Sequence, residues 1–300
     1  MLGATPPEFA ESRGGPRTGA SKPGFAIDAA YGEHGVIRDL LRPPDARTGI
    51  AAELHVRRAQ TFQIHYDLDF DALTARLNVH AAPAADDVFI HVVNASTLPG
   101  GRLAQIGAGP NFDGGLISLC ACNHGMRATL GPTEWRGRWI AGFTSYSGEF
   151  GHQQYLRYLM RVGEAYASHH ELEIALIDSG REHVLDAKDA SRHAAGDIWR
   201  VKPGAPKFNA RWRASNYYLP MIGHAHRGDI DDETWHKDIE YADQYGRRPA
   251  LLVGDPGWSF VWTQPFICRT DPGPLRRHQR ISVDSLLMHL RSNDAGTTPR

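Results

Sequence analysis

Hydrophobic and polar residues alternate with a period of two in the first strongly patterned part of the chain. Over residues 62–68 the apolar side chains fall at every second position, beginning with Phe62 and ending with Leu68. The same alternation returns over 73–79, after a polar turn at 69–71. A period of two is the pattern of a half-buried strand, so we expect these two segments to form a β-hairpin.

Beyond residue 86, short apolar runs are separated by Gly, Pro and Asn, which is typical of strands joined by turns. We expect six further strands, over residues 88–93, 116–120, 139–144, 155–162, 250–253 and 260–267. Two helices are expected, one over 169–177 and one over 282–291 with Ser282 as its cap. Many short strands and few long helices predict an α+β fold, with a mixed or antiparallel, strand-rich sheet or barrel and peripheral helices.

The density of apolar residues changes along the chain and sets the expected domain boundaries. Residues 1–24 are largely Pro, Gly, Ser, Thr and Ala with scattered charges, and we expect a disordered N-terminal arm there. Residues 25–85 are expected to form an N-terminal extension that contains the hairpin. The main domain is expected over 86–291, and residues 292–300 are expected to be a disordered tail.

The composition is that of an ordinary soluble globular protein. The 300 residues are 41% hydrophobic and 22% charged. The formal net charge of -1 gives no overall attraction to nucleic acid or anionic lipid, so any such contact needs a local patch. No apolar run approaches the roughly 18 residues of a membrane span, and no apolar signal segment is seen, so no membrane association is expected. Three cysteines cannot form a disulfide framework, which favours a cytoplasmic protein.

The segment 107–114, Gly-Ala-Gly-Pro-Asn-Phe-Asp-Gly, leads directly into an apolar run and is a candidate for the floor of a binding pocket. Asn111 carries an amide that can both donate to and accept from the edge of a base. Arg127 carries a planar guanidinium that suits phosphate or carboxylate. Aromatic residues further along the chain would supply stacking surfaces. A tight turn, a helix cap and a core of aromatic side chains explain the same residues equally well.

Cys120-Ala-Cys122-Asn-His124 places three side chains with metal-binding or nucleophilic chemistry within five residues. Zinc would need a ligand from elsewhere, so two buried core cysteines are favoured and no metal is expected. In an enzyme, Cys120 or Cys122 would be the nucleophile and His124 the acid–base group, which requires a cation beside the thiol. Phosphate-binding loops, dinucleotide-binding glycines, nucleophile elbows and zinc-protease motifs are absent, and no cofactor is expected.

Six short motifs follow one another along the main domain. They are Pro110-Asn111-Phe112, Leu119-Cys120-Ala121-Cys122 to Met126-Arg127, Trp139-Ile140-Ala141-Gly142 to Ser145, Tyr158-Leu159-Met160-Arg161-Val162-Gly163-Glu164, Gly196-Asp197-Ile198-Trp199, and Leu251-Leu252-Val253 to Phe260-Val261-Trp262. In this order they resemble the nucleotide modification associated domain 2 family, over roughly residues 86–291. The sequence departs from the family at Asn123-His124, which replaces Lys-Pro, and at Arg138, which replaces Asp.

The resemblance implies a role beside DNA-modification or phage-related systems. The strand-rich layout is also similar to PUA-like and EVE domains, which take an extruded modified base into an aromatic pocket. For this chain the two resemblances together imply a PUA-like barrel, with a modified nucleotide or nucleic acid as the partner. The residues expected to bind the ligand are Asn111, Phe112, Asn123, Arg127, Trp139, Ser145, Tyr146 and Trp199.

Three functions are weighed on these grounds. The first is a binding module that recognises a modified base or nucleotide, with DNA as the expected polymer. The second is an enzyme that modifies a nucleobase or nucleotide through the cysteine–histidine segment. The third is a protein-interaction scaffold that docks a protein partner through residues 25–80.

Overall fold

The computed structural model describes residues 64–78, 87–106, 109–193, 195–205, 214–221, 248–269, 274–276 and 279–292. The predicted N-terminal arm, most of the predicted extension and the tail beyond residue 292 lie outside these residues. The strands are β1 His65–Tyr66, β2 Val88–Val93, β3 Ser96–Thr97, β4 Ala104–Gln105, β5 Ser118–Leu119, β6 Trp139–Thr144, β7 Leu156–Tyr166, β8 Leu251–Val261, β9 Ile267–Arg269, β10 Arg280–Ile281 and β11 Leu290–Ser292. The α-helices are α2 Phe70–Asn78, α3 His124–Arg127, α4 Pro132–Trp135, α5 His169–Asp178, α6 Glu182–Lys188 and α8 Val283–His289.

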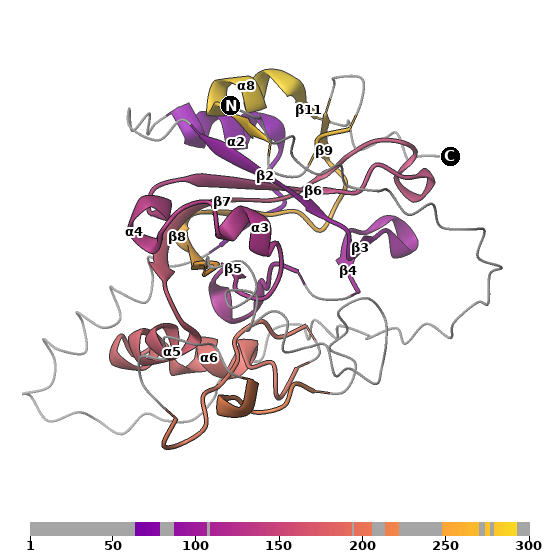
Figure 1. The fold of residues 1–300 in the computed structure, drawn as a ribbon. Helices are drawn as coiled ribbons and strands as arrows, with labels where there is room; N and C mark the ends of the chain where they lie inside the picture. Colours follow the sequence, from indigo (N-terminus) through magenta and orange to yellow (C-terminus); the bar gives the residue numbers. More distant parts are fainter. Residues whose placement is uncertain are drawn as a thin grey trace, which may run out of the picture. The chain divides into compact units, whose positions relative to one another are not determined.

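A mixed seven-stranded sheet organises the described part of the chain, and the fold is α+β (Figure 1). The strand order is β1-β8-β7-β6-β2-β10, with the short β5 paired to β8 outside this path. The pairs β6–β7 and β7–β8 are antiparallel, whereas β2–β6 and β1–β8 are parallel. The sheet is not a closed barrel. No helix in the described residues is long and apolar enough to cross a bilayer.

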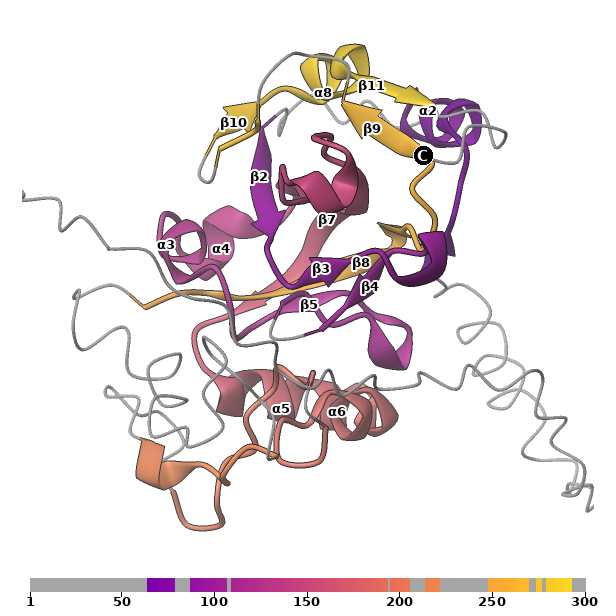
Figure 2. The same ribbon diagram turned by 90° about the vertical axis from the view of Figure 1, so that its right-hand side faces the viewer.

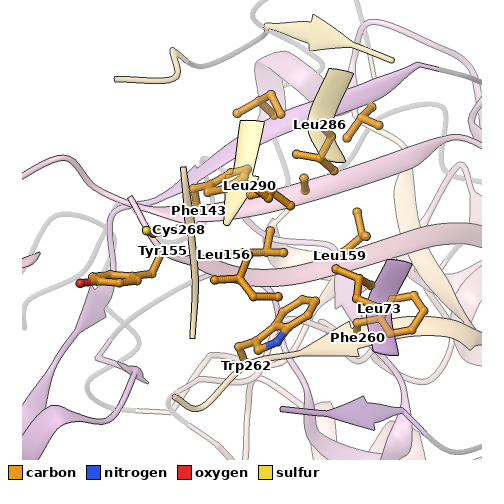
Figure 3. Close-up of a cluster of buried hydrophobic side chains, with 14 of the residues drawn as sticks. Leu73, Phe143, Tyr155, Leu156, Leu159, Phe260, Trp262, Cys268, Leu286 and Leu290 are labelled. Atoms are coloured by element: carbon orange, nitrogen blue, oxygen red, sulfur yellow. The ribbon is translucent and has the colours of Figure 1, made fainter. Parts of the chain in front are cut away.

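One face of the sheet carries a cluster of buried hydrophobic side chains (Figure 3). In β6 the alternate residues Trp139, Ala141 and Phe143 point to this face, where α2 and α8 cover them. Figures 1 and 2 both place these two helices on the side of the sheet opposite α5 and α6. Because helices and loops cover the other face as well, all six residues of β6 are buried.

The other face packs against α3, α4 and the segment around β5. Apolar side chains of the sheet, among them Phe89, Ile140, Met160 and Val162, form one buried cluster with Met126 of α3 and Trp135 of α4. A third apolar cluster joins α5 and α6 to the beginning of β8. The chain segment that links the second face to this third cluster is the loop around residues 109–118.

Several predicted elements are confirmed. The expected strands at 88–93 and 139–144 are β2 and β6, and the helix expected at 169–177 is α5. Ser282 caps α8 by accepting a hydrogen bond from the Ser285 amide, 3.0 Å away. The sequence predicted this cap correctly, because a cap depends only on neighbouring residues.

The predicted hairpin is wrong in its second half. Residues 70–78 form α2, and Asp69 Oδ1 caps it by accepting from the Ala72 amide at 2.7 Å. Leu73 and Leu77 are its buried residues, and a spacing of four fits a helix as well as a strand. Packing of these two leucines against the hydrophobic face settled the ambiguity.

The prediction of two strands, at 250–253 and 260–267, is wrong in its boundaries. One continuous strand, β8, runs from Leu251 to Val261, and a separate strand, β9, begins at Ile267. The Gly254-Asp255-Pro256-Gly257 segment reads as a turn in the sequence. In the structure it lies within β8, opposite register shifts in β7 between Met160 and Glu164. Bulges accommodate Gly and Pro in a strand without ending it.

Candidate functional site

A row of three residues crosses the sheet on its second face and forms the base of the candidate site. His91 of β2 stands opposite Gly142 of β6, and Gly142 stands opposite Tyr158 of β7. His91 Nδ1 and the Tyr158 hydroxyl are hydrogen-bonded at 2.8 Å, although a whole strand lies between them. Both side chains are buried.

Gly142 makes this cross-strand contact possible. A Cβ at residue 142 would lie 1.9 Å from Cε1 of Tyr158, which no pair of atoms tolerates. The Tyr158 ring therefore lies directly over the glycine backbone and reaches His91. A glycine in the middle of a strand often marks such a close approach.

A β-bulge brings a guanidinium to the same place. The register shifts between Gly142 and Phe143, which stand opposite Tyr158 and Leu156, so Arg157 is the extra residue. Regular alternation would put Leu156 and Tyr158 on one face, as the sequence pattern predicts. The bulge makes this prediction wrong, because it turns the two residues to opposite faces. Leu156 lies on the hydrophobic face and Tyr158 on the other face. The Arg157 guanidinium lies over the Phe112 ring, beside Tyr158.

Phe112 and Cys122 complete the cluster, which we call the His91–Tyr158 site (His91, Phe112, Cys122, Arg157 and Tyr158). The Phe112 ring is tilted against Tyr158 with centroids 5.9 Å apart, and the Arg157 Cζ lies 4.9 Å from the Phe112 centroid. Phe112 and Cys122 are partly exposed, whereas the other three are buried. Aromatic and cation–π contacts at these distances are favourable and fix the rings.

Burial keeps the Tyr158 hydroxyl protonated. It raises the pKa of this phenol well above its usual value, and the neighbouring Cys122 thiol adds to the effect. A neutral phenol can donate a hydrogen bond or a proton, but it is not a phenolate nucleophile at neutral pH. The site therefore offers a hydroxyl, an imidazole, a thiol and a permanent positive charge beside an aromatic ring.

The loop that carries Phe112 is held from beneath by a buried network. Asn111 and Ser118 exchange two backbone hydrogen bonds of 2.9 Å, which close the loop. The Lys188 ammonium donates to Asn111 O, Asn111 Oδ1 and Leu116 O at 2.8, 2.9 and 2.8 Å. Asp197 accepts from the Ser118 hydroxyl and from the Cys120 amide. We call these residues the Lys188 network (Asn111, Ser118, Cys120, Lys188 and Asp197).

The charges of this network are shifted by burial. Burial lowers the pKa of Lys188 to about 8, against the opposing attraction of Asp197, Asp113 and Cys120. Burial raises the pKa of Asp197, against the attraction of Lys188 and the hydrogen bond from Ser118. Two opposite charges in one dry region stabilise each other, and loss of either leaves the other exposed to the full cost of burial.

Asn111 and Arg127, the predicted ligand contacts, are used inside the protein. The Asn111 side chain donates to Ala195 O at 2.8 Å and accepts from the Asp113 amide and Lys188. Arg127 is fully buried and donates to the carbonyls of Cys122 and Ala250, each at 2.8 Å. These contacts favour a positioning role: Asn111 holds the Phe112 loop, and Arg127 holds the turn that carries Cys122.

Asn123 and His124 begin α3 beside that turn. Asn123 has φ of +56°, a left-handed conformation that Asn tolerates better than most residues. Its amide donates to the Met126 sulfur at 3.4 Å. His124 is the first residue of α3 and is partly exposed. Both lie next to Cys122 in the chain, at the partly exposed side of the site.

The two cysteines of the predicted catalytic segment separate. Cys120 packs in the cluster with α5 and α6, whereas Cys122 packs against the second face of the sheet. Burial raises the pKa of the Cys120 thiol well above its usual value, and the Asp197 carboxylate adds to this. Both effects oppose the thiolate that nucleophilic catalysis needs, so the geometry disfavours Cys120 as a nucleophile.

The remaining predicted ligand contacts do not gather with Phe112. Trp139 lies on the hydrophobic face of the sheet, because it alternates with Ile140. Trp199 is buried in the third cluster, where its amide donates to His169 Nδ1 at 3.1 Å. Ser145 and Tyr146 lie in the turn after β6, where Tyr146 is 44% exposed and its ring lies near His152.

The sequence analysis did not single out His91, Arg157, Tyr158 and Lys188 as site residues. Two signals were visible in the sequence, because each interrupts the apolar pattern of a buried strand. They are the histidine within Val-Phe-Ile-His-Val-Val and the glycine within Trp-Ile-Ala-Gly-Phe-Thr. Arg157 carried no signal, because only the bulge turns it toward Tyr158. Lys188 ends a helix 77 residues from Asn111, and nothing local predicts their contact.

No model of a protein family, no curated protein and no solved structure matches this chain. In the described residues, no group of three His, Cys, Asp or Glu side chains could hold a metal ion.

Proposed function

We propose that this chain is a binding module that recognises a modified base or nucleotide, with DNA as the expected polymer. The observation that carries the proposal is the convergence of Phe112, Arg157 and the hydrogen-bonded His91–Tyr158 pair at one position on the sheet. The resemblance to the nucleotide modification associated domain 2 family supports the same ligand class and a place beside DNA-modification or phage-defence systems.

The side chains suit the chemistry of a base. A base has flat faces that stack on aromatic rings and an edge that exchanges hydrogen bonds. Phe112 supplies a ring that is partly exposed and held by Arg157 and Tyr158. Base extrusion costs a few kcal/mol, and stacking returns about 1–3 kcal/mol per base, so one well-held ring offsets a large part of that cost.

A PUA-like mode of binding, in which an extruded base enters an aromatic pocket, is part of this proposal. The support for it is the ordered series of motifs over residues 86–291, together with the aromatic and polar groups of the His91–Tyr158 site. The near-neutral net charge fits selective capture of one altered nucleotide, since tight non-specific binding of DNA requires many phosphate contacts.

Modification of the bound base is a second candidate function. The observation that favours it is the 2.8 Å hydrogen bond between His91 and a phenol that burial keeps protonated, with the Cys122 thiol nearby. Because the raised pKa makes the phenol a weak acid, the histidine of the pair is the group that would exchange a proton with a base, as a general acid or base does. Mass spectrometry of the ligand recovered after incubation separates the two functions, because a binding module returns it unchanged.

The direct test is a binding panel of single-stranded DNA and RNA oligonucleotides and free nucleotides, each modified and unmodified, measured by fluorescence anisotropy and calorimetry. We expect selective binding, weakened roughly 5- to 150-fold by Phe112→Ala through the loss of stacking. Tyr218→Ala is the matched control, because Tyr218 is an exposed aromatic residue outside the site. Absence of binding to every member of the panel, or equal binding by the Phe112→Ala protein, would overturn the proposal.

A further inference from the structure

The loop that carries Phe112 rests directly on helix α6. Gly114 of this loop has φ of +67°, and a Cβ on it would lie 2.9 Å from the Cα of Val184 in the helix. Only glycine meets both restrictions, so the backbone of the loop touches the helix. The backbone hydrogen bonds between Asn111 and Ser118 close the loop. The position of Phe112 therefore depends on how the loop sits on α6.

Lys188, the last residue of α6, ties the loop to the helix by three hydrogen bonds. Its ammonium donates to Asn111 O, Asn111 Oδ1 and Leu116 O at 2.8, 2.9 and 2.8 Å, so it holds the loop on both sides of Phe112. An ammonium has three N–H donors and no acceptor, which matches these three oxygens. A neutral amine has two N–H groups and a lone pair, so one of the oxygens would lose its donor. The number of hydrogen bonds that hold the loop therefore depends on the proton of Lys188.

Charged and titratable groups face Lys188 from the elements packed around it. Asp197 lies in the segment after α6, Asp113 in the loop itself and Cys120 after β5. Arg127 of α3 acts in turn on Asp197 and Cys120. Burial outweighs the attraction of the carboxylates and lowers the pKa of Lys188 to about 8. The charge of Lys188 therefore changes in a range of pH where an ordinary lysine stays protonated.

We infer, resting on the proposed function, that Lys188 is a positioning residue whose proton holds the Phe112 loop where the ring can bind a base. Lys188 is buried, so it acts on the ligand through the loop. The affinity for the ligand then falls as the proton is lost, and a bound ligand makes Lys188 harder to deprotonate. The two effects are equal in free energy, because coupling between two binding equilibria is reciprocal.

The first measurement is the affinity of the wild-type protein at about pH 7.5 and about pH 9.5, by calorimetry at fixed ionic strength. The probe is a single-stranded oligonucleotide of adenine and cytosine with one 5-methylcytosine, because these bases do not titrate in this range. The tightest-binding adenine or cytosine ligand of the panel takes its place where it does not bind. We expect binding at least about fivefold weaker at the higher pH, within the usual range of coupling between two sites.

Substitutions then assign the pH dependence to one side chain. Lys188→Met should bind weakly at both pH values and lose the dependence. Where this variant does not fold, the double variant Lys188→Met/Asp197→Asn replaces it, because it leaves no unpaired buried charge. Phe112→Ala should lose the dependence as well, since Lys188 acts through this ring. Lys202→Met is the matched control: Lys202 is exposed and also donates to a backbone carbonyl, that of Ser215 at 3.1 Å, and the control protein should keep the wild-type profile.

Nuclear magnetic resonance checks the reciprocal effect on Lys188 itself. The chain has few lysines, so the ¹³Cε signal of Lys188 is assigned as the one missing from the variant and is titrated with and without the probe. We expect a higher pKa of Lys188 in the complex. Without ligand, the protection of the Asn111 and Ser118 amides from hydrogen exchange should fall as Lys188 loses its proton, whereas the amides of β6 keep theirs.

The outcomes separate the inference from the function on which it rests. Affinity that does not change with pH, or that changes equally in the Lys188 variant or in Phe112→Ala, overturns the inference and leaves the binding module standing. An equal pKa of Lys188 with and without the probe also overturns it. Absence of binding to every member of the panel overturns the proposed function. The hydrogen-exchange measurement then decides by itself whether Lys188 holds the loop, and unchanged protection of Asn111 and Ser118 refutes that role.

Discussion

The two faces of the central sheet are built from the same strands but differ in kind. On one face β6 and β7 contribute Trp139, Ala141, Phe143, Leu156 and Leu159 to a hydrophobic cluster, which α2 and α8 cover. On the other face the same strands contribute Gly142, Arg157 and Tyr158, and β2 contributes His91. Both faces bury hydrophobic side chains that stabilise the fold, and the second also holds polar groups that cost stability unless they are paired.

The two faces also differ in how they respond to substitution. A hydrophobic face tolerates exchange of one apolar side chain for another of similar volume. The polar face does not, because the His91–Tyr158 hydrogen bond depends on one glycine and one bulge. Substitutions on one face at a time test whether the two faces act independently.

The largest effect is expected at Gly142. Gly142→Ala would place a Cβ 1.9 Å from the Tyr158 ring, so the ring must leave its position and the His91 contact is lost. We expect a loss of about 4 kcal/mol or more in the free energy of unfolding, measured by urea denaturation. Gly148→Ala is the control, since a Cβ there meets open space, and it should change stability by less than about 0.5 kcal/mol. Equal urea midpoints for the two variants would refute the assignment of Gly142.

Adjacent residues of β7 give the sharpest contrast between the faces. Leu159→Ala on the hydrophobic face should cost about 2–5 kcal/mol of stability and leave the ligand affinity of the folded protein unchanged. Tyr158→Phe on the polar face should cost only about 1–2 kcal/mol, through the lost hydrogen bond to His91, and should weaken ligand binding. Denaturation and binding assays on both proteins check that the variant with the larger loss of stability is the one that keeps its ligand affinity. A change in affinity in the Leu159→Ala protein would show that the faces are not independent.

The smallest effect is a pH dependence that comes from Lys188. Below pH 8 the folded and unfolded chains both hold this proton, but between about 8 and 10.5 only the unfolded chain holds it, because the folded pKa is lowered to about 8. The Lys188 contribution to stability therefore rises as pH increases through this window. Raised tyrosine pKa values act in the opposite direction, so the measured quantity is the difference between wild type and Lys188→Met.

For that difference, we expect the stability advantage of the wild type to grow between pH 8 and pH 10 in urea denaturation. The Lys188→Met protein should be less stable throughout, because Asn111 and Leu116 lose a hydrogen-bond donor. A difference that stays constant with pH would mean that Lys188 titrates near its ordinary pKa in the folded protein.

Local patterns predicted much of the secondary structure. The strands β2 and β6 and the helices α5 and α8 were readable, since each is defined by apolar runs or by a cap a few residues away. The hairpin at 62–79 was misread because Leu73 and Leu77 fit two periods. Of the site, Phe112 and Cys122 were predicted and lie together, whereas Trp139 and Trp199 lie elsewhere.

Patterns along the chain were enough to predict the class of the fold, the elements with a clear period and the segment that carries Phe112. The tertiary structure alone decided which faces those elements present. A bulge at Arg157 reverses the face of Leu156, a glycine allows Tyr158 to reach His91, and Lys188 closes a loop 77 residues away. Periodicity describes neighbours along the chain, but register, bulges and buried ion networks are set by contacts between distant segments, which appear only when the sheet has formed.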